Sequence, residues 1–201
     1  MSEKEKILRQ AQDKQKRFEK MKQIRDDVMT LKESPLYKFR VSEGNKPVIG
    51  EGSHFAKIMF IGEAPGKEED LTGRPFIGRA GKLLTGLLEK NRINRKKVFI
   101  TSVIKHRPSK NRKPKKSELL ACEFWWEEQI KIIKPGLVVL LGKTAFDEVI
   151  NQNKSFSEFR GKFLIKNKDR YFVTYHPAAG LRFPRVRKLL EKDFKKLGGT
   201  P

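Results

Sequence analysis

The sequence predicts an α/β protein: a three-layer α/β/α sandwich with a central four-stranded parallel sheet, preceded by a long N-terminal helix. Short apolar segments of strand-like composition alternate with longer segments whose apolar residues recur every three or four positions. Strands that alternate with helices form a mainly parallel sheet with helices on both faces. A chain of 201 residues has room for one such domain and an appendage, and it contains no internal repeat.

The appendage is expected to be a charged helix over residues 1–33. An apolar stripe runs along it at three- and four-residue spacing, formed by Phe18, Met21, Ile24, Val28 and Leu31. Before Phe18 the stripe thins to Ile7 and Leu8, so the first turns are expected to project into solvent. The lysines of this helix are more typical of a solvated face than of a nucleic-acid arm. Residues 34–201 are expected to form the α/β domain, beginning with an irregular connection over residues 34–56.

Within this domain four short apolar segments are expected to be strands: 57–61, 98–104, 137–141 and 171–175. Helices are expected around residues 80–88, from about Ser117 to Ile133, and from about Pro184 to Leu197. In the second of these helices Ser117 is the expected N-cap, and the residues expected to face the core are Leu120, Phe124 and Ile130.

Composition restricts the partners of the chain. Its 46 Lys and Arg residues oppose 24 Asp and Glu residues, which gives a net charge of +22 and a pI of about 10.1. Such an excess favours nucleic acid as a partner, although solubility alone would explain it equally well. No apolar run approaches the ~20 residues that span a bilayer, so no membrane partner and an intracellular location are expected. The single cysteine, Cys122, excludes an internal disulfide and an all-cysteine metal centre within one chain.

Five short segments with Gly, Pro, acidic, aromatic or His residues fall at expected strand ends. They are 62–66 with the nearby Glu69 and Asp70, 73–78, 101–108, 141–142 and 175–179. Because ligands of open α/β sheets bind where the carboxyl ends of strands meet loops, these segments predict a pocket. A pocket inside so basic a shell indicates chemistry on nucleic acid.

Three features of this pocket suit a base that has been flipped out of a stack. The amides of the 62–66 turn can hold a carbonyl-bearing ring or a phosphate, although an ordinary strand-to-helix turn looks the same. Phe76 can stack on a flat ring, although core packing is an equally good explanation. His176, followed by a proline at a strand end, can hydrogen-bond a carbonyl oxygen and stabilise charge on a leaving base. His54 has no such context.

Taken in order, these motifs resemble the uracil-DNA glycosylase superfamily, most closely its family 4 of thermostable bacterial and archaeal enzymes. The resemblance spans roughly residues 31–195. It is carried by segments 50–52, 62–70, 73–81 and 105–108, by Asn111-Arg112 and Leu141-Gly142, and by 176–179 with Leu181-Arg182. It implies a four-stranded parallel sheet between helices and hydrolysis of the uracil–deoxyribose bond in DNA.

The resemblance also implies roles for residues: a water-activating turn at Glu63 to Gly66 with Glu69 and Asp70, a stacking aromatic at Phe76, and a leaving-group histidine at His176. Leu181 and Arg182 fall on the loop that enters the minor groove in relatives. The candidate catalytic residues are Glu63, Glu69, Asp70 and His176; the uracil-binding ones are Gly62, Ala64, Gly66, Phe76 and Ser102; the DNA-binding ones are Arg107, Lys110, Arg112, Lys113, Lys143, Leu181 and Arg182. The expected molecule is a monomer that acts on uracil-containing DNA in the cytoplasm, associated with the nucleoid.

The sequence departs from the family at its metal centre. Family 4 proteins hold a four-iron, four-sulfur cluster on four cysteines, of which the last matches Cys122. The third falls at His106, and the first pair falls near Leu31 and Ser34. One thiolate and one histidine are too few ligands for such a cluster, so no metal cofactor is expected. Packing of segment 31–36 against the Cys122 helix is expected in its place.

The second departure is Ser102, where relatives commonly have an asparagine that reads the base edge. An asparagine amide offers a donor and an acceptor, whereas serine offers one short hydroxyl. Two functions therefore stay open: a uracil-DNA glycosylase, and a DNA-binding relative with little or no catalytic activity that serves a repair or replication assembly. The presence of Glu63, Phe76 and His176 favours the enzyme.

Overall fold

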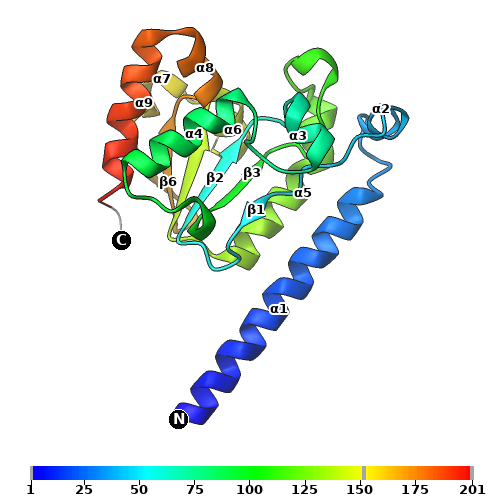
Figure 1. Cartoon of the computed structure of the whole chain (residues 1–201), viewed down its shortest axis with the longest axis vertical. Coiled ribbons are helices and arrows are strands. Elements are labelled where there is room, and N and C mark those ends of the chain that lie inside the picture. Colours follow the sequence, from blue (N-terminus) through cyan, green and yellow to red (C-terminus); the bar gives the residue numbers. More distant parts are fainter. Residues whose placement is uncertain (1, 151–152, 200–201) are drawn as a thin grey trace.

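The computed structural model describes residues 2–150 and 153–199 and is shown in Figure 1. In chain order its elements are α1 (Glu3–Met29), α2 (Tyr37–Ser42), β1 (Glu51–Gly52), β2 (Ile58–Gly62), α3 (Lys67–Thr72), α4 (Arg79–Lys90), η1 (Arg95–Lys97), β3 (Phe99–Ser102), η2 (Ser109–Asn111), α5 (Lys116–Ile133), β4 (Leu137–Leu141), α6 (Lys143–Val149), α7 (Phe156–Phe159), β5 (Phe163–Lys166), β6 (Asp169–Thr174), α8 (Pro177–Arg182) and α9 (Pro184–Leu197). No helix among the described residues has the length and apolar composition that crossing a membrane requires.

The sheet has six strands in the order β1-β3-β2-β4-β6-β5. Its four inner strands, β3, β2, β4 and β6, are parallel and correspond to the four that the sequence predicts. The predicted width of four strands is wrong, because antiparallel β1 and β5 are added at the edges. β1 has only two residues, and no residue of β5 is buried, so neither edge strand carries the apolar run by which the inner strands are recognised.

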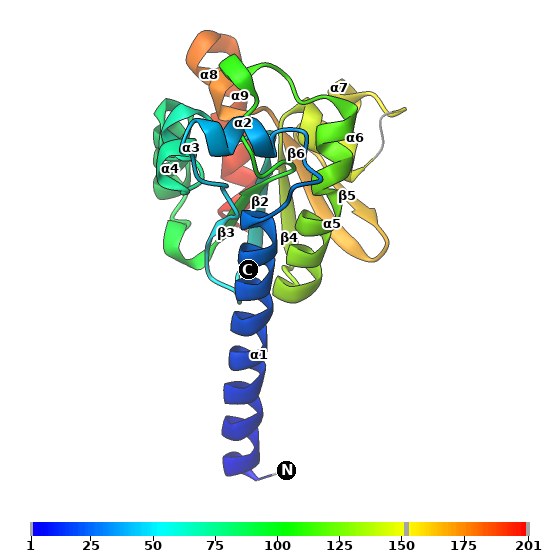
Figure 2. The same ribbon diagram turned by 90° about the vertical axis from the view of Figure 1, so that its right-hand side faces the viewer.

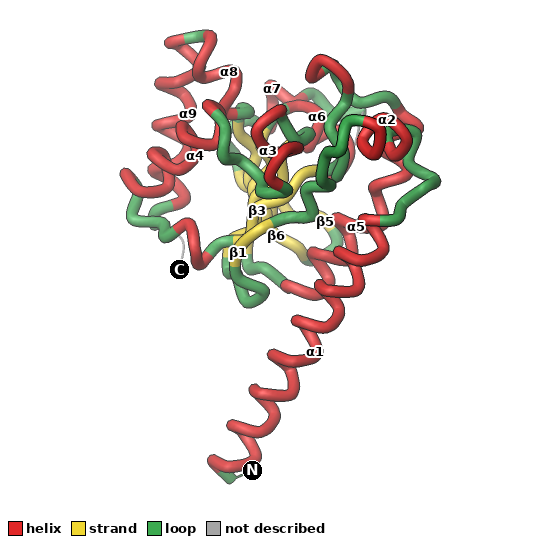
Figure 3. The backbone as a smooth tube through the Cα atoms, turned by 45° about the vertical axis from the view of Figure 1, so that its right-hand side comes forward, coloured by secondary structure: helices red, strands yellow, loops and turns green. Residues whose placement is uncertain are grey.

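Helices cover both faces of the sheet: in Figure 3 the yellow strands lie between red helices. The predicted three-layer sandwich is therefore confirmed. One core lies between the sheet and α5, α6 and the second half of α1. The other lies between the sheet and helices α4 and α9. β4 supplies both cores: Val138 and Leu140 face the first, and Leu137, Val139 and Leu141 face the second.

Helix α1 projects from the body of the domain, as Figures 1 and 2 show. Met21, Ile24 and Val28 are buried, but Phe18 is 58% exposed, so the apolar stripe is buried only from Met21 onward. The guanidinium of Arg17 donates hydrogen bonds to the carbonyl oxygens of His54 and Ile133 at the point where the helix leaves the body. The helix ends at Met29, before the expected residue 33.

Helix α5 corrects two expectations. Glu118 is buried and accepts a hydrogen bond from the Lys115 amide, so the helix begins at Lys116 and Ser117 is not its cap. Leu120 and Phe124, expected in the core, are 58% and 57% exposed. The face that packs on the sheet contains Trp126 and Ile133. Phe124 is two positions away from Trp126, and residues at this spacing lie on different faces of a helix. Ile130 packs at the edge of the first core, as expected.

Candidate active site

A cavity of about 650 Å³ lies at the carboxyl ends of the parallel strands. The predicted residues that line it are Glu63, Ala64, Gly66, Glu69, Phe76, Ser102, Arg112, Lys113, His176 and Arg182. Gly62 lies behind Phe76, since a Cβ atom there would stand 2.6 Å from that ring. The described wall of the cavity does not include Asp70, Arg107, Lys110, Lys143 or Leu181. The parallel strands therefore bring most of the predicted base-binding residues to one place.

Phe76 forms a flat, mostly buried wall of the cavity. Its φ of 51° lies in the left-handed region, which phenylalanine rarely adopts, so the surrounding structure must hold it there. Two glycines let the neighbours approach: a Cβ atom at Gly81 would come within 1.9 Å of the Phe76 carbonyl oxygen, and Gly62 makes room for the ring. The ring centroid lies 5.5 Å from that of His176. A planar ligand that enters the cavity can stack on Phe76 beside the imidazole.

Glu69 joins two loops of the cavity. Its buried carboxylate accepts hydrogen bonds from the amides of Gly66 at 3.1 Å, Ile77 at 2.9 Å and Gly78 at 2.8 Å. The turn after β2 is thus held against the loop that carries Phe76. A carboxylate with three backbone donors is engaged in positioning.

Asp70 points away from the cavity. Its carboxylate accepts a hydrogen bond from the Asn45 amide at 2.6 Å and lies 3.9 Å from the Arg107 guanidinium. Burial raises the pKa of Asp70 to about 6, and Arg107 and Arg40 oppose this shift. Of the three predicted carboxylates, Glu63 is the one that lines the cavity without such a clamp. It accepts one hydrogen bond, from the Thr144 hydroxyl on α6.

His176 caps helix α8 with its side chain. Its Nδ1 accepts a hydrogen bond from the Ala178 amide at 3.2 Å, so the proton of a neutral ring resides on Nε2. This Nε2 is buried and has no hydrogen-bond partner in the described part of the chain. Burial lowers the pKa of His176 to about 4, against the opposing effect of Glu69. A neutral imidazole thus presents an unpaired donor beside Phe76, an arrangement that a bound acceptor would satisfy.

Ser102 ends β3 and lies beside Gly62, with which it is in register on β2. Its hydroxyl is the side-chain group that this strand end offers to the cavity. Behind Ser102 lies a residue that the sequence analysis missed: Lys105 is fully buried and donates to the Ser102 carbonyl oxygen at 2.8 Å. The pattern that could have indicated a buried lysine is its place between an isoleucine and a histidine at a strand end.

Comparison with known proteins agrees with this geometry. The family model of the Uracil DNA glycosylase superfamily matches residues 49–197. The chain belongs to this superfamily. It is 43% identical over 189 residues to the Type-4 uracil-DNA glycosylase of Sulfurisphaera tokodaii, covering 90% of this chain and 84% of the relative. It is 44% identical over 183 residues to that of Saccharolobus solfataricus (87% and 83% covered) and 37% identical over 189 residues to that of Archaeoglobus fulgidus (90% and 93% covered).

The four positions that the resemblance matches to cluster cysteines come together in space. Leu31 and Cys122 pack in one apolar cluster with Leu36 and Ile104. Ser34 Oγ lies 3.0 Å from His106 Nδ1. A single buried thiol, its pKa raised by burial, is the one sulfur ligand on offer. These residues do not fit a four-iron cluster, and the described residues contain no group of three or more His, Cys, Asp or Glu that could hold a metal ion.

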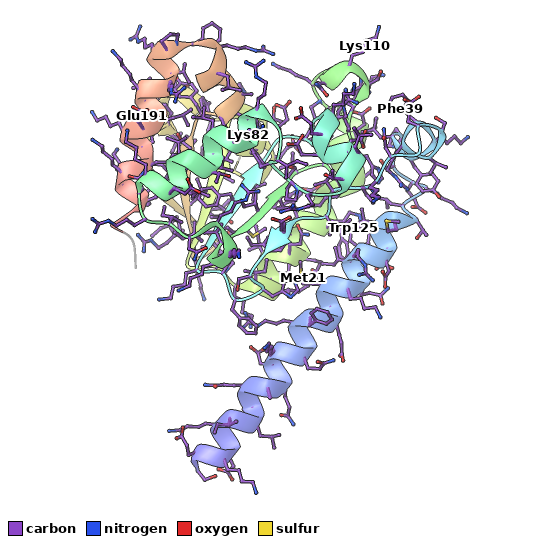
Figure 4. The ribbon with its side chains drawn as sticks, in the orientation of Figure 1. Met21, Phe39, Lys82, Lys110, Trp125 and Glu191 are labelled. Atoms are coloured by element: carbon purple, nitrogen blue, oxygen red, sulfur yellow. The ribbon has the colours of Figure 1, made fainter. Side chains whose placement is uncertain are left out.

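The predicted DNA-binding cations of this superfamily member fall into two sets. Arg112 pairs with the buried Glu118, Arg107 donates to Asn111 and faces Asp70, and Lys143 pairs with Asp147. Lys110, Lys113 and Arg182 are exposed and form no ion pair within the described residues. Lys110 stands at the tip of its loop in Figure 4. Arg107 and Arg112 thus fix loops and Lys143 pairs within α6, whereas the second set has no carboxylate partner in the described part of the chain.

Two exposed apolar side chains lie at the end of α8, where Leu181 and Arg182 belong to the helix instead of the expected loop and Phe183 follows it. Leu181, predicted to enter the minor groove, is 38% exposed and lines a separate groove between α4 and α9. Phe183 is 58% exposed and lines the cavity itself. The sequence analysis missed Phe183, for which the signal was an aromatic residue directly after the Leu181-Arg182 motif.

Proposed function

We propose that the chain is a uracil-DNA glycosylase that hydrolyses the N-glycosidic bond of uracil in DNA. The observation that carries the proposal is the neutral, unpaired Nε2–H of His176 beside the flat wall of Phe76. The Type-4 names of the relatives support the same substrate. The fold brings these two groups, the turn amides and Glu63 to one cavity at the edge of the sheet.

The geometry suggests how the residues divide the reaction. A flipped uracil stacks on Phe76, and its carbonyl oxygens face the start of the turn after β2, before Pro65 and before Gly66, whose amide Glu69 already binds. As the bond between C1′ of the sugar and N1 of uracil breaks, its electron pair leaves with the base. The Nε2–H of His176 donates to the oxygen on which negative charge grows, without giving up its proton. Water oriented by Glu63 bonds to C1′ and gives its proton to the Glu63 carboxylate, from which the proton passes through solvent to the uracil anion, whereas Glu69 and Asp70 hold the loops in place.

The decisive experiment is single-turnover cleavage of a uracil-containing oligonucleotide by the wild type and by His176→Ala. The substitution should slow excision by about a hundred- to a thousandfold and leave DNA affinity nearly unchanged, because the contact strengthens only as charge develops. Since the pKa of His176 is about 4, the ratio of the two rates should stay constant between pH 5.5 and 7.5. His54→Ala, which alters a histidine outside the cavity wall, serves as the control. Intact cleavage with weakened binding would make His176 a docking residue.

Ser102 leaves a second function open, that of a DNA-binding protein without efficient catalysis. A DNA-binding relative that lacks efficient catalysis would have the same fold, the same free cations and a base reader with one contact. Absence of any cleavage by the wild type, with tight binding to DNA, would establish that alternative.

Ser102 should limit the recognition of uracil. Sites that hydrogen-bond a substrate discriminate sharply against analogues that leave those groups unpaired, so a reader with one contact is less selective. Ser102→Asn is therefore expected to raise uracil excision and to widen its preference over other deaminated bases, measured on a panel of substituted oligonucleotides. Loss of activity would mean that the cavity is built around serine and that its natural substrate is another base.

DNA is expected to contact the free cations near the cavity mouth. Each phosphate contact contributes about −0.9 to the slope of log K against log salt on duplex DNA. Replacing Lys110 and Lys113 with serine should reduce the magnitude of that slope by about 0.9 per lost contact. The same charge loss at Lys20 and Lys22, exposed on the projecting helix α1, should leave it unchanged. If both double substitutions change the slope equally, the effect comes from the net charge of the protein and not from phosphate contacts of Lys110 and Lys113.

We further propose that the protein holds no iron–sulfur cluster and acts as a monomer. The ligand count supports the first part of this proposal, since Cys122 is the one thiol of the chain. Protein prepared without oxygen should be colourless and free of iron and sulfide, and Cys122→Ala should leave excision unchanged. Stoichiometric iron in such material, with a dimeric mass by light scattering, would show that two chains share a cluster.

A further inference from the structure

A lysine that no step above uses lies behind the wall of the cavity. Lys105 is fully buried, and its Nζ donates hydrogen bonds to Thr101 Oγ1 at 2.7 Å, the Ser102 carbonyl oxygen at 2.8 Å and Gln129 Oε1 at 2.9 Å. No carboxylate forms an ion pair with it among the described residues. Burying an ammonium without a counter-charge is strongly unfavourable, and such violations concentrate at functional sites.

Burial lowers the pKa of Lys105 to about 7, and the surrounding hydrogen bonds oppose this shift because they favour the charged form. Gln129 Nε2 donates to the Ile49 carbonyl oxygen at 2.8 Å, which turns Oε1 of the same amide toward Lys105. The Thr101 hydroxyl also lies 2.8 Å from the Ile49 carbonyl oxygen and has one proton to give. All these bonds form together when Nζ carries three hydrogens, because a neutral amine would need the Thr101 proton for itself.

Ser102 connects this charge to the cavity. Its carbonyl oxygen binds Nζ, whereas the same residue lines the cavity on the other side of the strand end. One residue thus separates a buried ammonium from the base site. In a cavity that excludes water, a fixed charge at this separation acts strongly on an anion that forms during the reaction.

We propose that Lys105 is a positioning residue for base release. Its ammonium fixes the Ser102 end of β3 and, through the cavity wall, stabilises the negative charge on the departing uracil. This role rests on the proposed glycosylase function.

The test compares two leaving groups in the same DNA. Fluorine withdraws electrons, so 5-fluorouracil stabilises its own departing anion and needs less help than uracil. Lys105→Met, a neutral side chain of similar length, should slow single-turnover excision of uracil by about tenfold or more and that of 5-fluorouracil by at most about threefold. Equal losses for both bases would make Lys105 a purely structural residue and overturn the proposal.

Two substitutions of Gln129 serve as matched controls. Gln129→Leu removes the hydrogen bonds of the Gln129 amide with Lys105, Ile49 and Thr101 and introduces no charge, so it should slow both bases equally. Gln129→Glu gives the ammonium a carboxylate partner, while Ile49 keeps its bond from Thr101. It should reproduce the leaving-group difference of Lys105→Met, and it provides the test if that variant does not fold. An unchanged ratio in Gln129→Glu would overturn the proposal, whereas a wild type that excises neither base would instead refute the glycosylase function.

Discussion

The buried carboxylate of Glu69 is the constraint on which the rest of the site depends. Its bonds to the amides of Gly66, Ile77 and Gly78 join the loops that precede and follow α3. Because the second loop is held there, Phe76 keeps a backbone conformation that phenylalanine rarely adopts, and its ring stays against Gly62. The same carboxylate acts on His176, yet burial prevails and the imidazole stays neutral. One acidic side chain therefore positions the stacking wall and influences the donor beside it.

Net charge is a poor guide to which cations meet DNA in this molecule. Close to the cavity, Arg107 and Arg112 face the buried carboxylates of Asp70 and Glu118, and these ion pairs hold the loop in position. The cations left free, such as Lys110 and Lys113, lie on the loop that those pairs hold in place. The buried ion pairs therefore fix the loop, and the exposed lysines on the same loop supply positive charge to the surface.

The features that could be predicted from the sequence are those set by neighbouring residues in the chain. The four parallel strands were recognisable because each is a short apolar run buried on both faces, and His176 because it precedes a proline at a strand end. Exposed β5 and two-residue β1 carry no such signal. The orientation of α5 was misjudged because apolar residues occur on both its faces, and only packing against the sheet selects one. Glu69 binds amides that lie within nine residues of it, but the direction of its side chain depends on how the flanking loops fold. The surroundings of Asp70 depend on Asn45 and Arg107, which are distant in sequence, and the burial of Lys105 depends likewise on the distant Gln129.

The corner formed by Leu31, Ser34, His106 and Cys122 combines apolar packing with one polar pair. Leu31 and Cys122 fill space by apolar packing, and Ser34 Oγ lies within hydrogen-bond distance of His106 Nδ1. Beside them the Arg40 guanidinium donates to the carbonyl oxygens of Met29 and Asn45 and so ties the end of α1 to the loop before β1. The buried Arg40 Nε of this corner has no hydrogen-bond partner among the described residues. Buried groups of this kind oppose folding, so the apolar contacts of this corner must offset them. The attachment of α1 therefore relies on burial of Val28 and Leu31 more than on polar bonds.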